Sequence, residues 1–297
     1  MVKIIGSGKY KKFSKDIACI LNIDYINVII NKFSGNEFHI KLKSYLYDEQ
    51  VIIIQSTCNP VNDNLLKLLL LVDSIKLSGA RKVISVIPYF GYSRQNQYNP
   101  LEPCSMKVIA KILKTAGIDH VITLDLHSKE SKEYFEIGIE NLDIELLFPL
   151  FINKINNISN KIIVSPDKGS INRAQSLAKA LYCDFVFLNK IRTEKNTCNM
   201  YDISSSIKGK NCIIIDDIID TGETIIKASN LLMNNGAKSI QVIATHAVFS
   251  RKTEQKLISS CIEKLFLANT IQRKFNNPKF YTLNITSILA DAIKLVI

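Results

Sequence analysis

The 297-residue sequence predicts an α/β protein made of two duplicated domains, each a mostly parallel sheet flanked by helices. Short continuous apolar runs alternate with helical patterns along the chain, as expected when parallel strands are buried on both faces. Helical patterns begin soon after polar strand ends and stop at a glycine, which commonly terminates a helix. Two stretches of the chain also repeat the same order of elements, which indicates an internal duplication.

The clearest repeat pairs residues 51–80 with residues 212–237. Each stretch begins with an apolar strand, VIII or CIII, and continues through a polar loop into a helical pattern over 64–78 or 223–235. Each ends at a Gly-Ala pair, after which another apolar strand begins. The first copy lacks the acidic residues of the second, so we expect only the second to keep a sugar site.

The beginnings of the two halves match as well. Residues 3–21 and 161–181 each contain a short apolar strand, a turn rich in small and polar residues, and a helical pattern. We therefore expect one domain over residues 1–146 and a second over 147–286, with a final helix over 287–297 that packs back on the first.

The composition, with 47% hydrophobic and 22% charged residues, is that of a globular protein. The longest apolar run, residues 65–72, is too short to span a membrane and contains Lys67, and the N-terminus has no signal-peptide pattern. Seven scattered cysteines without a CxxC pair indicate reduced thiols rather than disulfides or a zinc site. We therefore expect a cytoplasmic protein that has no membrane partner.

The net charge of +11 does not by itself indicate a nucleic-acid partner. The lysines are spread through the chain, without an arginine-rich block or a strand that combines basic and aromatic residues. A basic cleft for anionic small molecules explains the sign of the charge equally well.

Residues 212–227, CIIIDDIIDTGETIIK, contain the most informative functional pattern. A buried strand, a tight loop and a helix N-terminus form an anion site, because free backbone N–H groups and the positive end of the helix dipole point into the loop. Thr221 and Thr224 add hydroxyl donors, and Gly222 lets a ligand approach the backbone closely.

The carboxylates Asp216 and Asp217 precede this loop. Acids beside a phosphate cradle suit sugar hydroxyls or a metal, so the pattern predicts a phosphorylated sugar with its phosphate in the loop. The alternative is an ordinary strand, turn and helix with acids at the strand end.

Residues 88–97, PYFGYSRQNQ, form a glycine turn rich in aromatic residues. Aromatic rings can face an adenine, and Arg94 can pair with a polyphosphate in a bidentate manner. The alternative is a packed loop without a ligand.

These two motifs together resemble one family. Residues 212–227 resemble the motif for phosphoribosyl diphosphate (PRPP) that phosphoribosyltransferases and PRPP synthetases share, and PYFGYSRQ resembles the PYFGYARQ of PRPP synthetases. The resemblance runs in register from Phe33 to the C-terminus. It implies two phosphoribosyltransferase-like domains and ribose-phosphate pyrophosphokinase activity. In that reaction the anomeric hydroxyl of ribose 5-phosphate attacks the β-phosphorus of ATP, which gives PRPP and AMP for nucleotide biosynthesis.

The resemblance also implies roles for particular residues. The ATP-binding residues are Phe33, Gly35, Asn36, Glu37, Arg94 and Gln95. The ribose 5-phosphate-binding residues are Arg192, Asp216, Asp217, Asp220, Thr221, Gly222, Glu223 and Thr224. The catalytic residues are Lys190 and Arg192, on a loop over about 189–204 that we expect to act as a mobile lid.

Two further residues, His127 and Asp167, are implied to position Mg²⁺. Each also has a simpler interpretation, His127 as an ordinary imidazole and Asp167 as a helix cap.

Two residues depart from the family pattern: Gly35 replaces an aspartate, and Glu223 replaces a glycine or another small residue. They keep open the hypothesis of a non-catalytic, regulatory relative, besides a phosphoribosyltransferase and, more distantly, a nucleic-acid binder. The retained acids and the Lys190 and Arg192 pair argue against the first.

Residues 44–48 align with a family segment that contains an arginine used for allosteric phosphate and ADP, but here they contain none. The chain thus resembles the subgroup without ADP inhibition, and we expect ADP to act only as a competitor of ATP. The family further implies a homo-oligomer, with inorganic phosphate as an activator.

Overall fold

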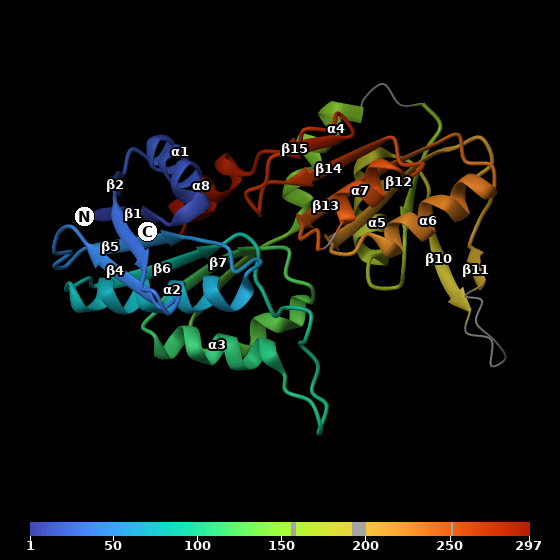
Figure 1. Cartoon of the computed structure of the whole chain (residues 1–297). Coiled ribbons are helices and arrows are strands. Elements are labelled where there is room, and N and C mark those ends of the chain that lie inside the picture. Colours follow the sequence, from blue (N-terminus) through green and yellow to red (C-terminus); the bar gives the residue numbers. More distant parts are fainter. Residues whose placement is uncertain (156–158, 192–199, 251) are drawn as a thin grey trace. The chain divides into compact units, whose positions relative to one another are not determined.

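The computed structural model describes residues 1–155, 159–191, 200–250 and 252–297, which form two compact units (Figure 1). Unit 1 comprises Met1–Asp143, Thr270–Gln272 and Ile285–Ile297, and unit 2 comprises Ile144–Asn269 and Arg273–Asn284. Among the described residues, no helix is both long and apolar enough to cross a membrane.

Unit 1 contains a six-stranded parallel sheet in the order β2-β1-β5-β6-β7-β8. Its strands are β1 (Val2–Gly6), β2 (Asp24–Ile26), β5 (Gln50–Ile54), β6 (Lys82–Ile87), β7 (His120–Leu124) and β8 (Gly138–Leu142). The central strand β5 is buried along its whole length because helices cover both faces of the sheet.

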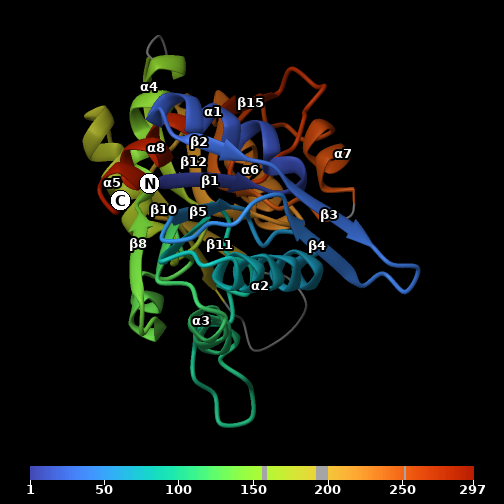
Figure 2. The same ribbon diagram turned by 90° about the vertical axis from the view of Figure 1, so that its left-hand side faces the viewer.

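The helices of unit 1 form two layers, with α1 and α8 on one face of the sheet and α2 and α3 on the other (Figure 2). They are α1 (Lys11–Leu21), α2 (Val61–Leu77), α3 (Ser105–Thr115) and α8 (Thr286–Lys294), with short 3-10 turns η1 (Gly8–Tyr10) and η2 (Lys129–Tyr134). Leu68, Leu71 and Ile75 of α2 are fully buried in the core of this unit.

A separate antiparallel hairpin, β3 (Val28–Lys32) and β4 (Phe38–Leu42), projects from unit 1 (Figure 2). Its strands pair only with each other among the strands of this unit. The ion pair of Lys32 with Asp63 of α2, at 2.8 Å, links the hairpin to the helix behind it.

Unit 2 contains a seven-stranded sheet in the order β11-β10-β9-β12-β13-β14-β15, parallel except for β11. Its strands are β9 (Lys161–Ser165), β10 (Phe185–Ile191), β11 (Met200–Ile203), β12 (Asn211–Ile219), β13 (Ser239–Ala247), β14 (Lys264–Ala268) and β15 (Phe280–Leu283). Its helices are η3 (Ile144–Leu147), α4 (Phe148–Ile155), α5 (Ile171–Leu181), α6 (Glu223–Asn234) and α7 (Thr253–Ile258).

The two units share one topology, which confirms the predicted duplication. The order β2-β1-β5-β6-β7-β8 corresponds strand for strand to β10-β9-β12-β13-β14-β15. The helices after the last strand of each unit also correspond, because α8 packs on α1 as α4 packs on α5.

Some boundaries differ from those expected. Helix α2 begins at Val61 rather than at residue 64, since Pro60 is tolerated just before the first turn and Asp63 suits the positive end of the helix dipole. The segment expected to be a lid is partly regular, because Leu188–Ile191 pair with residues 200–203 in an antiparallel ladder. Residues 192–199 lie outside the described chain.

Candidate active site

Two adjacent acids, Asp216 and Asp217, lie at the carboxyl end of the central strand of unit 2. The expected strand ended at residue 215, but β12 extends to Ile219 because its ladder with β13 continues as far as the pairing of Ile219 with Ala247. Both acids are therefore held within the sheet, with exposed fractions of 7% and 5%. Carboxylates this deeply buried need compensating partners.

Asp216 accepts hydrogen bonds from the Ser170 hydroxyl at 2.8 Å and from the Asp217 backbone N–H at 3.0 Å. Burial, followed by the negative charge of Asp217, raises the pKa of Asp216 to about 8. The Asp216 carboxyl therefore holds a proton at neutral pH, and can donate a hydrogen bond as well as accept one.

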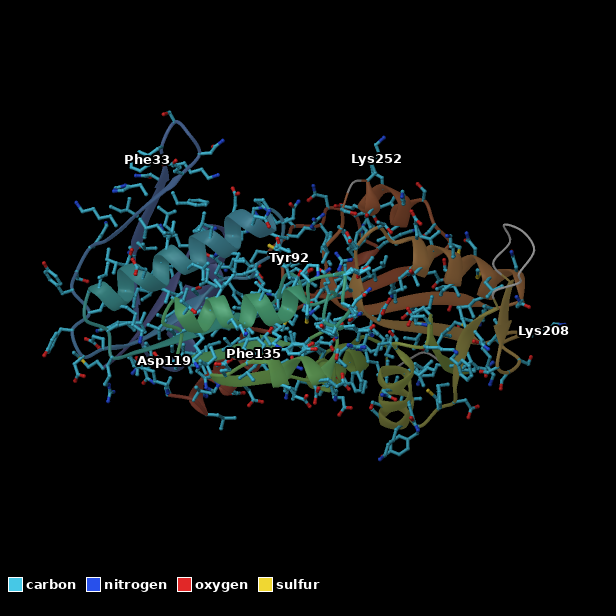
Figure 3. The ribbon with its side chains drawn as sticks, turned by 90° about the horizontal axis from the view of Figure 1, so that it is seen from below. Phe33, Tyr92, Asp119, Phe135, Lys208 and Lys252 are labelled. Atoms are coloured by element: carbon cyan, nitrogen blue, oxygen red, sulfur yellow. The ribbon has the colours of Figure 1, made fainter. Side chains whose placement is uncertain are left out.

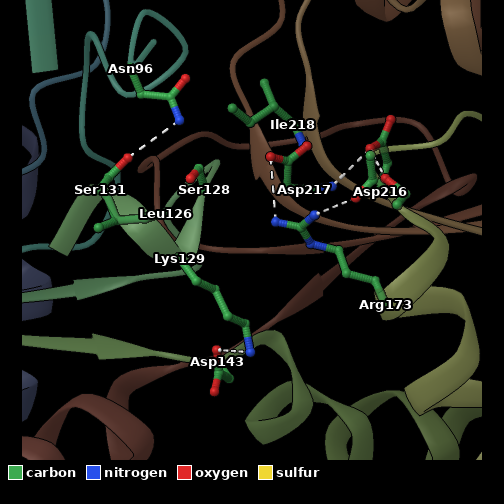
Figure 4. Close-up of polar contacts among 12 residues, drawn as sticks. Asn96, Leu126, Ser128, Lys129, Ser131, Asp143, Arg173, Asp216, Asp217 and Ile218 are labelled. Carbon is green, nitrogen blue, oxygen red and sulfur yellow. Dashed lines mark hydrogen bonds and ion pairs between the residues drawn. The ribbon is translucent and has the colours of Figure 1, made fainter. Parts of the chain in front are cut away.

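Asp217 is paired differently (Figure 4). Its carboxylate accepts the Ile218 backbone N–H at 2.8 Å and lies 3.6 Å from a guanidinium nitrogen of Arg173 on helix α5. The sequence analysis identified neither Arg173 nor Ser170 as part of this site. Their only signal was position, since both follow the strand end at Ser165 within two helical turns.

The loop after β12 leaves the start of helix α6 without a side-chain cap. Gly222 is the N-cap residue and has the left-handed backbone conformation, with φ of 75°. A Cβ atom at Gly222 would lie 3.2 Å from Cγ2 of Thr253, so the close packing also favours glycine. The first turn of a helix presents N–H groups that lack intrahelical acceptors, and these attract anions.

Glu223, the unexpected acid of this loop, is exposed and faces two lysines. Its carboxylate oxygens lie 4.0 Å from the Nζ atom of Lys227 on the same helix and 4.0 Å from that of Lys256 on helix α7. Neighbouring positive charge therefore offsets the negative charge that Glu223 adds beside the anion-binding turn.

Asp167 forms a capping turn at the end of β9. Its Oδ1 atom accepts the backbone N–H groups of Gly169 at 2.9 Å and Ser170 at 3.2 Å. The structure thus gives Asp167 the capping role that the sequence left open, while the exposed carboxylate remains accessible to a cation.

The metal-binding capacity of the described residues is limited, because no three His, Cys, Asp or Glu side chains cluster closely enough to hold an ion. Mg²⁺ usually keeps several waters and binds one or two protein carboxylates together with substrate phosphates. The single exposed carboxylate of Asp167 fits that mode of binding.

The catalytic pair is only partly placed. Lys190 lies on β10, where its backbone is paired with Tyr201 of β11. Arg192 lies outside the described residues.

In unit 1, the turn after β6 is packed rather than open. Tyr89 and Phe90 are 4% and 2% exposed, and the Phe90 ring packs edge-on against Phe135 in the core. The expectation that these rings face an adenine is therefore wrong for both, because the apolar interior of the unit takes them up. Tyr92 lies at the surface (Figure 3), where its hydroxyl donates to the Asn62 side chain.

Arg94 and Gln95 follow this turn and are exposed. Gln95 is fixed against the start of α3, because its side chain accepts from the Ser105 hydroxyl and its carbonyl accepts the Met106 N–H at 3.1 Å. This holds the loop at the carboxyl edge of the sheet, where ligands bind in such folds.

The loop after β7 lies beside this segment (Figure 4). Asn96 donates to the Ser131 hydroxyl at 3.5 Å, and its carbonyl accepts the Tyr134 hydroxyl at 2.6 Å. His127 is exposed at the beginning of that loop. The structure therefore gathers Arg94, Gln95 and His127 at one edge of the unit 1 sheet.

Phe33 to Glu37 form the tip of the β3–β4 hairpin, with Phe33 57% exposed (Figure 3). The turn is closed by the Phe33 N–H, which donates to the Glu37 carbonyl at 2.9 Å, and Asn36 takes a positive φ of 66°. At Gly35 an added Cβ would meet no atom within 4 Å, so the glycine is not required there for steric reasons.

The comparisons with known proteins agree with this description. Residues 2–117 match the family model for the N-terminal domain of ribose phosphate pyrophosphokinase, and residues 142–280 match that of the phosphoribosyl transferase domain. The ribose-phosphate pyrophosphokinases of Campylobacter jejuni and Aquifex aeolicus are each 37% identical to this chain, over 99% of it and 95% of their own lengths.

A solved structure shows the same fold. The phosphoribosylpyrophosphate synthetase from Mycobacterium smegmatis superposes with a TM-score of 0.91 at 27% identity, over 99% of this chain and 98% of that one. The fold and the acidic strand end thus define a protein with two phosphoribosyltransferase-like domains. More particularly, the chain belongs to the ribose-phosphate pyrophosphokinase family.

Proposed function

We propose that this chain transfers the β,γ-diphosphoryl group of ATP to the anomeric hydroxyl of ribose 5-phosphate and forms PRPP and AMP. The observation that carries the proposal is the buried acid pair, Asp216 and Asp217, immediately before an uncapped helix start in unit 2. The family to which the chain belongs supports the same reaction.

Ribose 5-phosphate would bind with its phosphate on the turn from Asp220 to Thr224, including Thr221, Gly222 and Glu223. Backbone N–H groups and the hydroxyls of Thr221 and Thr224 supply donors for the phosphate oxygens. Asp216 and Asp217 would bind the ribose hydroxyls. A protonated Asp216 beside an ionised Asp217 offers a donor and an acceptor to two neighbouring hydroxyls.

ATP would bind residues of unit 1: Phe33, Gly35, Asn36, Glu37, Arg94 and Gln95. The exposed ring of Phe33 offers a stacking surface for a purine, and Arg94 has the planar donor geometry that suits phosphate. Lys190 and Arg192 would stabilise the transferred group, since phosphoryl transfer depends chiefly on in-line positioning and neutralisation of charge.

Asp167 and His127 are the residues proposed to hold Mg²⁺ with the phosphates of ATP. The bound cation would supply charge neutralisation on the phosphate oxygens. Asp167 is preorganised for this role by its capping turn, which fixes the direction of the carboxylate.

Phosphorus NMR on the purified protein with magnesium, ATP, ribose 5-phosphate and inorganic phosphate tests the proposal. We expect AMP and PRPP to appear in equal amounts. Binding of ATP without turnover would instead support a non-catalytic, regulatory relative, while diphosphate released only from added PRPP and a nucleobase would support a phosphoribosyltransferase.

Regulation and assembly are part of the proposal. We infer a cytoplasmic homo-oligomer in which inorganic phosphate activates and ADP only competes with ATP. The segment from Ser44 to Asp48 supports the absence of ADP allostery, because it contains no arginine. Inhibition by ADP that saturating ATP does not relieve would contradict this.

A further inference from the structure

The charges around Glu223 form a compact group on the outer surface of unit 2. Glu223 and Lys227 lie one turn apart on α6, and Lys256 approaches the same carboxylate from α7. These three residues line a hollow of about 390 Å³ between the two elements, together with Ile226, Asn230, Ser259, Ser260 and Cys261.

Helix α7 is anchored to the proposed phosphate loop, which fixes where Lys256 can reach. The Thr253 hydroxyl, in the first turn of α7, contacts the Asp220 carbonyl at 2.7 Å, and the Ser250 N–H donates to the same carbonyl at 3.1 Å. Thr253 is 1% exposed and packs against the Gly222 position. Lys256 is three residues further along, so its backbone is held at a set distance from the loop.

The three charges together present one net positive charge to the first turn of α6. Glu223 alone would repel a phosphate dianion in that turn, but two ammonium groups lie within 4.0 Å of its oxygens. All three side chains are roughly half exposed, so their mutual pairing contributes little to stability. Their effect on a charged ligand nearby is a different matter, because it depends on the sum of the charges.

We propose, on the basis of the proposed ribose 5-phosphate site, that Lys256 is a positioning and specificity residue whose charge compensates Glu223. Lys256 makes the Glu223 loop a phosphate site in this chain, where relatives with a small residue at that position need no such compensation. Lys227 shares the task from within α6, but Lys256 is the contribution of a separate element.

The test is a charge cycle on the full-length protein. Lys256→Met should raise KM for ribose 5-phosphate about threefold to tenfold while kcat and KM for ATP stay unchanged, since one charge near a dianion is removed in a largely solvated site. Glu223→Gln should lower KM for ribose 5-phosphate, and the double variant should return it to near the wild-type value.

Two further measurements separate charge from structure. Lys238→Met removes an exposed lysine just beyond the other end of α6 and should leave every kinetic constant unchanged. The effect of Lys256→Met should shrink at 0.5 M salt, because screening reduces interactions between exposed charges. An unchanged KM in Lys256→Met, or a double variant no better than Lys256→Met alone, would overturn the inference.

Direct binding keeps this inference apart from the proposed reaction. The dissociation constant of ribose 5-phosphate, measured by calorimetry without ATP, should follow the same cycle even if the wild type shows no turnover. Failure of turnover with the cycle intact would count against the reaction alone. Failure of the wild type to bind ribose 5-phosphate would overturn the role of Lys256 itself.

Discussion

The guanidinium of Arg173 lies 3.6 Å from the carboxylate of Asp217, and both side chains are largely withdrawn from solvent, at 15% and 7% exposure. Arg173 belongs to helix α5 and Asp217 to strand β12, so the pair joins a helix to the central strand of the unit 2 sheet. A charge pair in this position has a structural consequence that is separate from any role in binding.

Arg173→Met should lower the free energy of unfolding of unit 2 by roughly 3 kcal/mol, because it leaves the buried Asp217 charge poorly compensated. Urea denaturation at pH 7 measures the loss. The double variant with Asp217→Asn should recover most of the stability, since the buried charge is then gone as well. Lys179→Met, an exposed change on the same helix, is the control, and a loss as large there would contradict this explanation.

Asp216→Asn should make stability less dependent on pH. The pKa of Asp216 in the folded protein is raised to about 8 by burial and by Asp217, above the ordinary value of 3.8. The folded state therefore keeps a proton that the unfolded state releases between about pH 4 and pH 8, so stability falls as the pH rises through that window. The loss amounts to a few kcal/mol, at about 1.4 kcal/mol for each unit of pKa difference.

The measurement compares urea denaturation at pH 5 and pH 8. We expect the wild type to lose stability at pH 8 and Asp216→Asn to lose less, because an amide does not titrate. Asp184→Asn, at an exposed position of the same unit, should retain the wild-type slope. Parallel slopes for wild type and Asp216→Asn would show that Asp216 is already ionised at pH 5.

The sequence predicts the fold well because its signals are local. Buried parallel strands appear as continuous apolar runs such as that of β12, and the ends of helices are marked by residues such as Gly236. The repeated order of elements then fixes the pairing of the two halves, and the motif residues Asp216 to Thr224 fall at a strand end as expected.

Other features depend on contacts between distant segments, which residue patterns do not encode. Arg173 meets Asp217 only through the docking of α5 on the sheet, and Phe90 is buried because Phe135 packs against it. An aromatic residue in a turn has the same appearance in sequence whether it faces a ligand or the core. Strand β11 was missed because its polar residues are paired through the backbone alone.

Gly91→Ala should be strongly destabilising, whereas Gly35→Ala should be neutral. A Cβ at Gly91 would lie 2.4 Å from the Thr57 carbonyl oxygen and 2.9 Å from Cγ1 of Val61, so backbone would have to move. A Cβ at Gly35 meets nothing within 4 Å. We expect a loss of roughly 2 kcal/mol or more for Gly91→Ala, of the size seen for overpacking, and within 0.5 kcal/mol of zero for Gly35→Ala.

Thermal unfolding of both variants measures this difference. Gly35→Asp, which introduces the acid found at this position in the family pattern, should be accommodated equally well. The affinity for ATP of that variant then shows whether the missing acid matters for binding. A melting temperature for Gly91→Ala within 1 °C of the wild type would mean that the turn can shift away from Thr57.

Gly222→Ala should weaken ribose 5-phosphate binding, and Gly209→Ala provides a matched control. Both glycines have positive φ, 75° and 70°, so alanine costs about 1 kcal/mol of backbone strain at either position. Only at Gly222 would the new Cβ meet a neighbour, Cγ2 of Thr253 at 3.2 Å, whereas nothing lies within 4 Å at Gly209. The two variants should therefore lose similar stability, but only Gly222→Ala should raise KM for ribose 5-phosphate, by about tenfold, because the turn that presents N–H groups to the phosphate must shift. Steady-state kinetics together with melting temperatures separate the two effects, and an equal rise in KM in both variants would show that backbone strain alone, rather than the geometry of the turn, controls binding.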